Sequence, residues 1–273
     1  MVIILKLGGS IITDKSKPMK IRYNVIERIA KEVREFINKN EDKLVIIHGG
    51  GSIGHYLVWK LRVKEEGWPP LKYSIIAHEM LKLSSIIANA FIKEGIPSIV
   101  IPPHAIFSLG ENLVIKYGAQ TINIIKGYLD RNIIPILYGD AVIYEKGNTK
   151  FEILSGDDIA WLLASVLGAR KLLFATSVDG VYDKHPKEKD AKLIKELNLR
   201  SIKFNEKTVS SKNNGKYYDV TGGMMNKLKA GMKYINSLKD TEILIFNGLI
   251  EGNIYKALID KPIRYTQVKI KFE

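Results

Sequence analysis

Leu44-Val-Ile-Ile-His-Gly-Gly-Gly-Ser-Ile-Gly-His55 is the stretch on which the organisation of the chain depends. Its first four residues are apolar and three of them are β-branched, which predicts a buried strand. A glycine-rich turn follows at once, and a helical pattern begins after the turn. Glycines let backbone N–H groups approach a ligand closely, and the next helix adds its positive N-terminal end. The stretch therefore predicts an anion site, most often one for a phosphate.

Two known glycine patterns fit this stretch incompletely. Gly49, Gly51 and Gly54 satisfy G-x-G-x-x-G, but a dinucleotide site also needs an acidic residue about twenty positions later, where this chain has Trp68-Pro-Pro70. The P-loop spacing also fits, but the Lys-Ser/Thr pair that completes a P-loop is absent. A third interpretation keeps the anion site and makes His55 a specific phosphate contact. A plain turn without a ligand remains the fourth, although it does not need four glycines.

Composition limits the class of protein. The chain has 273 residues, of which 46% are hydrophobic, enough for one large α/β domain or two lobes. The net charge of +13 raises the question of nucleic-acid binding. However, the basic residues alternate with acidic ones, and no dense basic tract with interleaved aromatic residues occurs. We therefore expect no nucleic-acid partner and infer that the surplus charge gathers polyanionic small molecules.

The location follows from what the sequence lacks. There is no cysteine and no run of 18 apolar residues, and the first residues enter a short strand, Val2-Ile-Ile-Leu5. We therefore predict a cytoplasmic protein that does not cross a membrane.

A parallel sheet is predicted from the order of the elements. An apolar stripe at helical spacing from Val25 to Ile37 returns the chain from the first strand to the strand at Leu44, which makes a βαβ unit. Further strands are predicted over 133–138, 170–176 and 241–246, and 264–270 is expected to close the sheet as an edge strand. Ligands of such sheets bind beyond the carboxyl ends of the strands.

Other glycine-containing segments carry lysines. Lys6-Leu-Gly-Gly-Ser10 follows the first strand, Lys15 comes shortly after it, and Gly222-Gly-Met-Met-Asn-Lys227 opens a later helix. A lysine at a strand end beside a glycine turn can place its ammonium on a phosphate, although each lysine alone is more often solvated. Ser155 is a candidate N-cap, and Asp157 either complements the helix dipole or pairs with a lysine.

The order and spacing of these segments resemble the amino acid kinase superfamily over nearly the whole chain. The motifs that carry the resemblance are Lys6-x-Gly-Gly-Ser10, Gly49-Gly-Gly-Ser52, Gly139-Asp140, Ser155-Gly-Asp157, Asp179-Gly-Val-Tyr182 and Asp219-Val-Thr-Gly-Gly-Met224 with Lys227. Within the superfamily, His55 after Gly-Gly-Gly-Ser-Ile-Gly is similar to the isopentenyl phosphate kinases. Ile53 departs from the aromatic residue that we expect there more often, a difference that concerns the packing nearby and leaves the glycines and His55 in place.

The resemblance implies a fold and a set of partners. It implies an α/β protein whose three-layer α/β/α sandwich surrounds a mainly parallel open sheet. The whole chain, 1–273, would be one domain, with a substrate-binding lobe over about 1–168 and a nucleotide-binding lobe over about 169–273. It also implies ATP and Mg²⁺ as cofactors, no metal site made of protein side chains alone, and a homodimer.

The resemblance also implies roles for single residues. Lys6 and Lys227 would touch the transferring phosphoryl group and ATP, Lys15 would lie at the γ-phosphate, and Asp157 would hold the lysines in place. The remaining roles are for glycines and polar residues: the ATP phosphates at Gly8, Gly9, Ser10 and Gly50; the substrate phosphate at Gly49, Gly54 and His55, with Gly156 close by; the nucleotide at Asp179, Lys184 and Gly223.

The expected reaction is ATP-dependent phosphorylation of isopentenyl phosphate to isopentenyl diphosphate, a step of isoprenoid biosynthesis in an alternative mevalonate pathway. The alternative is another small-molecule kinase of the same fold, acting on fosfomycin, UMP or acetylglutamate. The side chains of Ile76, Met80 and Leu83 either belong to the core or line a pocket for an apolar substrate tail.

Overall fold

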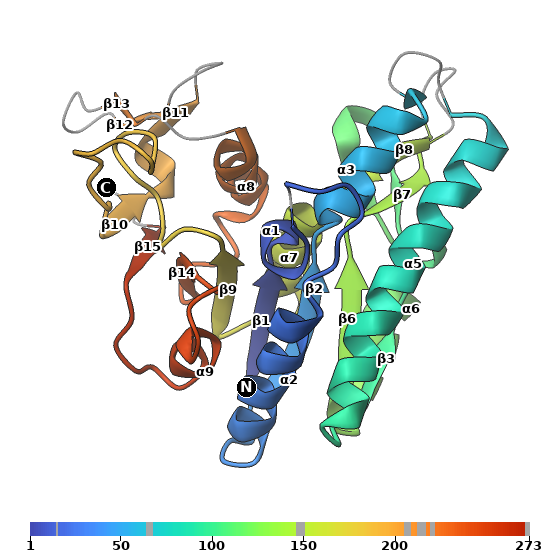
Figure 1. The fold of residues 1–273 in the computed structure, drawn as a ribbon, viewed down its shortest axis with the longest axis horizontal. Coiled ribbons are helices and arrows are strands. Elements are labelled where there is room, and N and C mark those ends of the chain that lie inside the picture. The colour runs from blue at the N-terminus through green and yellow to red at the C-terminus, as the bar shows by residue number, and fades with distance from the viewer. Residues whose placement is uncertain are drawn as a thin grey trace.

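A sheet of eight strands runs through the middle of the computed structural model, which describes residues 1–14, 16–63, 68–145, 151–204, 209–211, 217–218 and 222–270 (Figure 1). In spatial order its strands are β10 (Glu196–Asn198), β15 (Tyr265–Lys269), β14 (Glu242–Asn247), β9 (Lys171–Thr176), β1 (Val2–Leu7), β2 (Lys43–His48), β6 (Ile134–Tyr138) and β3 (Ser98–Val100). The six strands from β14 to β3 are parallel, β15 is antiparallel to β14, and β10 is parallel to β15.

Helices cover both faces of the sheet, each over its own hydrophobic core. One face carries α1 (Gly9–Ile12), α2 (Tyr23–Ile37), α3 (Gly51–Lys60), α5 (Pro70–Lys93) and α9 (Asn253–Leu258), and the other carries α6 (Ala119–Asp130), α7 (Gly156–Val166) and α8 (Gly222–Gly231). The predicted three-layer α/β/α sandwich around a mainly parallel sheet is therefore confirmed. Its division into two lobes near residue 168 stays a prediction.

The βαβ unit predicted from the apolar stripe sets the position of both N-terminal glycine turns. Ile26, Ile29, Val33 and Phe36 of α2 are buried against the sheet, and the helix returns the chain so that β1 and β2 pair in parallel. Leu7 is then the register partner of His48. The turns that follow these two residues therefore begin side by side at the same end of the sheet.

The expectation that residues 264–270 form an edge strand is wrong. Strand β15 lies between β14 and β10, so β10 is the edge of the sheet on this side. Strand β10 has only three residues and lies in a polar, charged part of the sequence, which is why its apolar pattern is too short to predict it.

Three smaller sheets lie outside the main sheet: β4 (Ser108–Leu109) with β5 (Ile115–Lys116), β7 (Asp140–Ile143) with β8 (Phe151–Leu154), and β11 (Ile202–Phe204) with β12 (Val209–Ser211) and β13 (Tyr217–Tyr218). Helix α5 is the one described helix that is long and apolar enough to cross a membrane, and half of its apolar window is buried inside the protein, as in a core helix.

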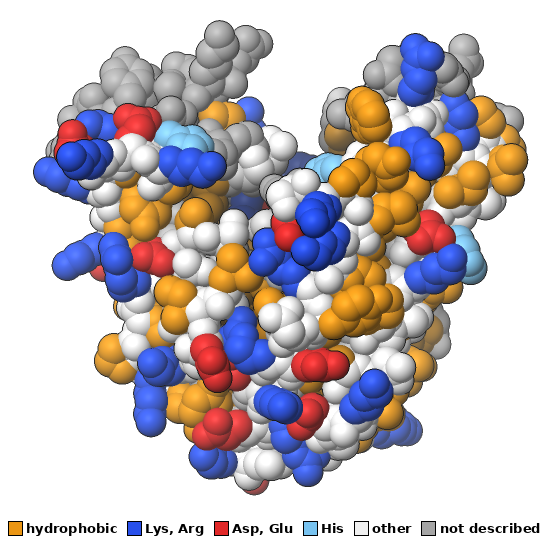
Figure 2. Space-filling view, viewed as in Figure 1, with side chains coloured by type: hydrophobic (Ala, Val, Ile, Leu, Met, Phe, Trp, Pro, Cys, Tyr) orange, Lys and Arg blue, Asp and Glu red, His pale blue; other side chains and the backbone are white. Residues whose placement is uncertain are grey.

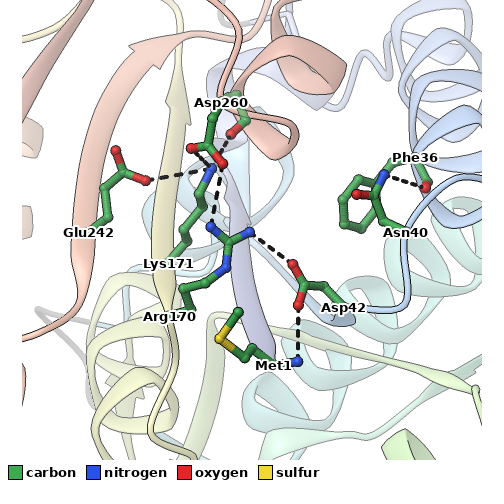
Figure 3. Close-up of polar contacts among 9 residues, drawn as sticks. Met1, Phe36, Asn40, Asp42, Arg170, Lys171, Glu242 and Asp260 are labelled. Carbon is green, nitrogen blue, oxygen red and sulfur yellow. Dashed lines mark hydrogen bonds and ion pairs between the residues drawn. The ribbon is translucent and has the colours of Figure 1, made fainter.

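Charged groups fix the end of the sheet where the parallel strands begin (Figure 3). The side chain of Lys171 at the start of β9 is fully buried, and its Nζ donates to Ala257 O at 3.0 Å and pairs with Asp260 and Glu242. Arg170 joins Asp260 to Asp42 on the neighbouring strand connection. Burial raises the pKa of Asp260, but the hydrogen bonds and positive charges of Lys171 and Arg170 together outweigh burial and lower it overall.

The opposite end of the sheet, where the parallel strands finish, is hollowed. Figure 2 shows this hollow between two projections, which in the same view as Figure 1 lie over α8 and β10 on one side and over α3 and α5 on the other. The glycine turns after β1 and β2 lie at this end. In open parallel sheets, ligands bind beyond the carboxyl ends of the strands, so this is the end where a ligand site is expected.

The buried Lys171 provides a test of the packing at the end of the sheet where the parallel strands begin. Asp260 has φ 60°, which asparagine tolerates, so Asp260→Asn removes the charge without new backbone strain. We expect this variant to lower the free energy of unfolding by about 1–3 kcal/mol, because it weakens the compensation of a buried ammonium. Lys171→Met, which removes that charge and keeps the apolar stem, is expected to cost less. Urea denaturation of both variants measures the difference, and a larger loss in Lys171→Met would contradict the explanation.

Candidate active site

The glycine turns after β1 and β2 pack backbone against backbone. A Cβ on Gly9 would lie 2.3 Å from the nitrogen of Gly51, and one on Gly49 would lie 2.9 Å from the nitrogen of Gly9. Gly51 also has φ +54°, a conformation that L side chains rarely adopt. The contact therefore explains why the sequence has glycine at these positions before any ligand is considered.

Thr13 fastens the two turns together. This buried side chain donates its hydroxyl to Gly9 O at 2.7 Å and accepts from the backbone N–H of Ser52 at 2.8 Å. Its role was not predicted, because the contact with Ser52 joins residues that are 39 positions apart and leaves no local pattern.

Two lysines from distant parts of the chain meet on one carboxylate oxygen. Lys6 Nζ and Lys227 Nζ each lie 2.6 Å from Asp157 Oδ1, and the two lysines are only 6% and 5% exposed. Although burial raises the pKa of Asp157, the ammonium groups of Lys227 and Lys6 outweigh burial and lower it to about 2. Asp157 is therefore ionised, and the cluster keeps one uncompensated positive charge when both lysines are protonated.

Lys227 is held by two aromatic side chains, Trp161 of the neighbouring helix α7 and Phe174 of strand β9. The indole N–H of Trp161 donates to Lys227 O at 2.8 Å, which ties α8 to α7, and Lys227 Nζ lies 4.5 Å from the centre of the Phe174 ring. Burial lowers the pKa of Lys227 to about 8, although the carboxylate of Asp157 acts in the opposite direction.

Asp157 is positioned by the start of α7. Ser155 is the N-cap, and its hydroxyl accepts from the N–H of Asp158 at 3.1 Å, as predicted from the sequence. Gly156 touches the end of β2, since a Cβ there would lie 2.8 Å from His48 O. The helix that carries Asp157 therefore begins directly against the strand that leads into the glycine turn.

His48 orients the first peptide of that turn, and sequence reasoning did not assign it. Its Nδ1 lies 3.1 Å from Gly49 O and its Nε2 lies 2.9 Å from Ser84 Oγ. A carbonyl only accepts, so Nδ1 carries the proton and Nε2 accepts from the Ser84 hydroxyl. Burial lowers the pKa of His48 to about 4, so the ring is neutral near pH 7. Because C=O and N–H of one peptide point in opposite directions, the bond to Gly49 O directs the N–H of Gly50 away from His48.

A second polar group lies at the ends of β9 and β14. Asp179 accepts from Asn247 Nδ2 at 3.2 Å and pairs with Arg264 at 3.2 Å. Asn247, which the sequence did not single out, ends β14 beside Thr176 of β9. Gly8 belongs to the same edge, since its N–H donates to Ala175 O at 2.9 Å.

The other predicted residues lie around the carboxyl end of the sheet. Ser10 lies in α1, Gly50 is the N-cap of α3, and Gly54 and His55 lie in its first turns. Gly223 is the second residue of α8, with no described atom within 4 Å of an added Cβ, and Lys184 is exposed in the chain after Tyr182. Lys15 and residues 219–221 lie outside the described residues.

No metal site is formed by the described side chains alone: among them, no three histidine, cysteine, aspartate or glutamate residues come together in a suitable cluster. The carboxyl end of the sheet instead carries the ammonium groups of Lys6 and Lys227, the backbone N–H groups of the glycine turns and the N-terminal end of α3. Groups of these kinds bind phosphates.

Comparison with known proteins gives one consistent result. The model of the amino acid kinase family matches residues 1–247. An isopentenyl phosphate kinase from Methanocaldococcus jannaschii is 36% identical over 269 residues, which cover 95% of each chain. One from Methanothermobacter thermautotrophicus is 31% identical and covers 98% of each chain. A solved isopentenyl phosphate kinase superposes with a TM-score of 0.81 at 28% identity, over 98% of this chain and 100% of the other.

The pKa of Lys227 can be measured directly. We expect the labelled side-chain carbon of Lys227 to titrate in NMR spectra near pH 8, well below the value of about 10.4 for exposed lysines. Asp157→Asn is expected to lower that midpoint further, because it removes the carboxylate that favours the protonated form. Titration of Lys227 together with the exposed lysines would contradict the assigned burial.

The contact between the glycine turns predicts a large effect of one methyl group. Gly9→Ala must push the turns apart, so we expect it to lower the free energy of unfolding by about 3 kcal/mol. Gly118→Ala is the matched control, because nothing described lies within 4 Å of its added Cβ; Gly118 is the N-cap of α6, where alanine is less favourable than glycine, so a loss of at most about 1 kcal/mol is expected there. Thermal denaturation compares the two, and equal midpoints would rule out the close contact.

Proposed function

The chain belongs to the amino acid kinase family, and from this membership we propose that it transfers the γ-phosphoryl group of ATP to isopentenyl phosphate. The products are isopentenyl diphosphate and ADP. The observation that carries the proposal is the pair of buried lysines on Asp157, next to the glycine turn that leads to His55.

The charge of this pair suits the reaction. Transfer between two phosphates brings two polyanions together, and catalysis consists mostly of positioning and charge stabilisation. Lys6 and Lys227 would contact the transferring phosphoryl group, and Asp157 would fix both ammonium groups without neutralising the pair. Lys15 would add a third cation at the γ-phosphate.

On the donor side, the fit rests on the turn after β1 and the open space at α8. Gly8, Gly9, Ser10 and Gly50 would cradle the ATP phosphates, and Gly223, which has free space above its Cα, would face the nucleotide with Asp179 and Lys184. Mg²⁺ bound to the phosphate oxygens would neutralise part of their charge, since it needs few protein ligands.

On the acceptor side, Gly49, Gly54 and His55 would hold the phosphate of the substrate, with Gly156 close by. The peptide that follows Gly49 is already oriented through His48, which supports binding of an anion by the N–H of Gly50. His55 would donate a hydrogen bond from its ring, more strongly when protonated.

Other features of the family remain proposals for this chain. They are a place in isoprenoid biosynthesis, Mg²⁺ as the metal, a homodimer and a cytoplasmic location. A kinase of the same fold acting on fosfomycin, UMP or acetylglutamate is the alternative that the first experiment below excludes or supports.

Substrate identity is tested by ADP release in a coupled assay with Mg-ATP. We expect isopentenyl phosphate to give the highest kcat/KM among phosphomonoesters and related acceptors, because His55 and the glycine turn would hold its phosphate. No turnover of isopentenyl phosphate together with good turnover of UMP, fosfomycin or acetylglutamate would contradict the substrate and leave the family unchanged.

His55→Ala tests the acceptor site. We expect kcat/KM for isopentenyl phosphate to fall about ten- to hundredfold, because a hydrogen bond to a charged group is lost, while the thermal midpoint stays within a few degrees. His78→Ala on the exposed side of α5 is the matched control and should retain full activity. Unchanged kinetics in His55→Ala would remove His55 from the site.

A further inference from the structure

Helix α2 holds the segment 248–255, which leads the chain from β14 into α9. Helices α2 and α9 lie side by side on one face of the sheet (Figure 1). Two side chains one turn apart on α2, Arg28 and Glu32, form an ion pair that faces this segment. The side chain of Arg28 is 17% exposed and that of Glu32 is 10% exposed. A charged pair with so little contact with water needs several hydrogen bonds to offset its desolvation.

The ion pair finds these hydrogen bonds on the backbone of the segment. Glu32 Oε1 accepts from the N–H of Gly252 at 3.1 Å, and its Oε2 accepts from the N–H of Tyr255 at 3.0 Å. Arg28 Nη2 donates to Gly248 O at 2.6 Å. Both partners of the pair therefore fix the same segment, one through its N–H groups and the other through the carbonyl directly after β14.

Asn247, the last residue of β14, is fixed by the same segment. Its side-chain Oδ1 accepts from the N–H of Leu249 at 3.0 Å, and its main-chain oxygen accepts from Asn253 Nδ2 at 2.9 Å. Its Nδ2 donates to Asp179 Oδ1 at 3.2 Å. Because an N–H only donates and a carboxylate only accepts, these two partners determine the orientation of the amide. The side chain of Asn247 therefore connects the segment to Asp179.

Asp179 has weaker partners on its other oxygen. Its Oδ2 lies 3.2 Å from Arg264 Nη1 and 3.5 Å from the Tyr182 hydroxyl. The side chain of Arg264 is 71% exposed, so water competes for this ion pair. Asn247 instead belongs to a strand inside the main sheet. The contact with Asn247 is therefore the one that ties the orientation of the Asp179 carboxylate to the sheet.

We propose that Asn247 positions Asp179 for the nucleotide, and that Arg28 and Glu32 are positioning residues that hold Asn247 in place from α2. The location of the nucleotide beside Asp179 rests on the proposed function. ATP carries its negative charge on its phosphates, so a carboxylate that turned toward them would repel the ligand. A carboxylate helps binding only where it meets donor groups of the nucleoside, and this requires a fixed orientation.

Asn247→Asp breaks the link to Asp179 and keeps the link to the segment. The substitution leaves an oxygen for the N–H of Leu249 and replaces the donor that faces Asp179 with a second oxygen. We expect the Kd of Mg-ATP, measured by calorimetry on the full-length protein without acceptor, to rise about tenfold near neutral pH, because a hydrogen bond to a charged group becomes a repulsion. An unchanged Kd would overturn the proposal, and so would the absence of Mg-ATP binding by the wild-type protein.

Acidification gives a readout that a simple loss of stability would not produce. The carboxyl group introduced at position 247 faces the carboxylate of Asp179, and this like charge raises its pKa. Once protonated, the introduced group can donate to Asp179 as the amide does. We therefore expect the ratio of the variant Kd to the wild-type Kd to fall at least about threefold between about pH 7.5 and about pH 5. A constant ratio would contradict the positioning role of Asn247.

Glu32→Gln tests the contribution of α2. Glutamine has a single side-chain oxygen, so it cannot accept from the N–H groups of Gly252 and Tyr255 together. We expect the Kd of Mg-ATP to rise about three- to fivefold. Glu35→Gln is the matched control, because it makes the same change on the same helix in an exposed ion pair with Lys39 and should keep the wild-type Kd. Equal Kd values in the two variants would overturn the role of α2.

The double variant shows whether Glu32 acts through Asn247. Substitutions along one chain of contacts do not have additive effects. Once the link to Asp179 is broken, loosening of the segment matters less, so we expect Glu32→Gln to raise Kd less than about twofold in the Asn247→Asp background. The full increase of the single variant in that background would overturn the connection from α2 to Asn247.

Steady-state kinetics separate this inference from the proposed function. If the protein phosphorylates isopentenyl phosphate, Asn247→Asp should raise KM for ATP about tenfold and change KM for isopentenyl phosphate less than about twofold, because the proposed acceptor site lies at the turn after β2. Equal increases in both KM values would overturn the proposal. If Mg-ATP binds but isopentenyl phosphate is not phosphorylated, the proposed function fails, and the calorimetric comparison still decides whether Asn247 positions Asp179.

Discussion

One carboxylate oxygen holds the candidate active site together. Asp157 Oδ1 lies 2.6 Å from the ammonium groups of both Lys6 and Lys227, and without it two like charges would be buried side by side. The three residues come from β1, α7 and α8, so the contact requires the sheet and the helices on one face to be assembled first. Trp161 and Phe174 reinforce it by fixing the backbone and the side chain of Lys227.

A second constraint, between backbones, determines where this charge can act. Gly9 and Gly51 approach so closely that no side chain fits between the turns, and Thr13 bonds to both turns. The close approach follows from the register of β1 and β2, which places Leu7 opposite His48. The glycines thus have a packing role in this fold in addition to any contact with phosphate, and the sequence alone does not separate the two roles.

Much of this arrangement could be predicted from local patterns. The apolar run at Leu44, the stripe of α2 and the cap at Ser155 each lie within one element, and each is confirmed. The family resemblance brought Lys6, Asp157 and Lys227 together, which no periodicity could do. Thr13, His48 and Asn247 were missed because their partners are far away in the chain or at the end of another strand. The edge position of β10 was missed because three residues carry no periodic signal.

The distribution of charge explains why the two ends of the sheet differ. At the end where the parallel strands begin, the amino group of Met1, Arg170 and Lys171 face Asp42, Glu242 and Asp260, so three positive groups meet three negative ones. At the other end, two lysines share one carboxylate, and the glycine turns and the start of α3 add N–H donors. A balanced cluster stabilises the fold and attracts no ion strongly. An excess of positive charge in a hollow is unfavourable until an anion arrives, which supports our proposal that phosphates bind at this end of the sheet.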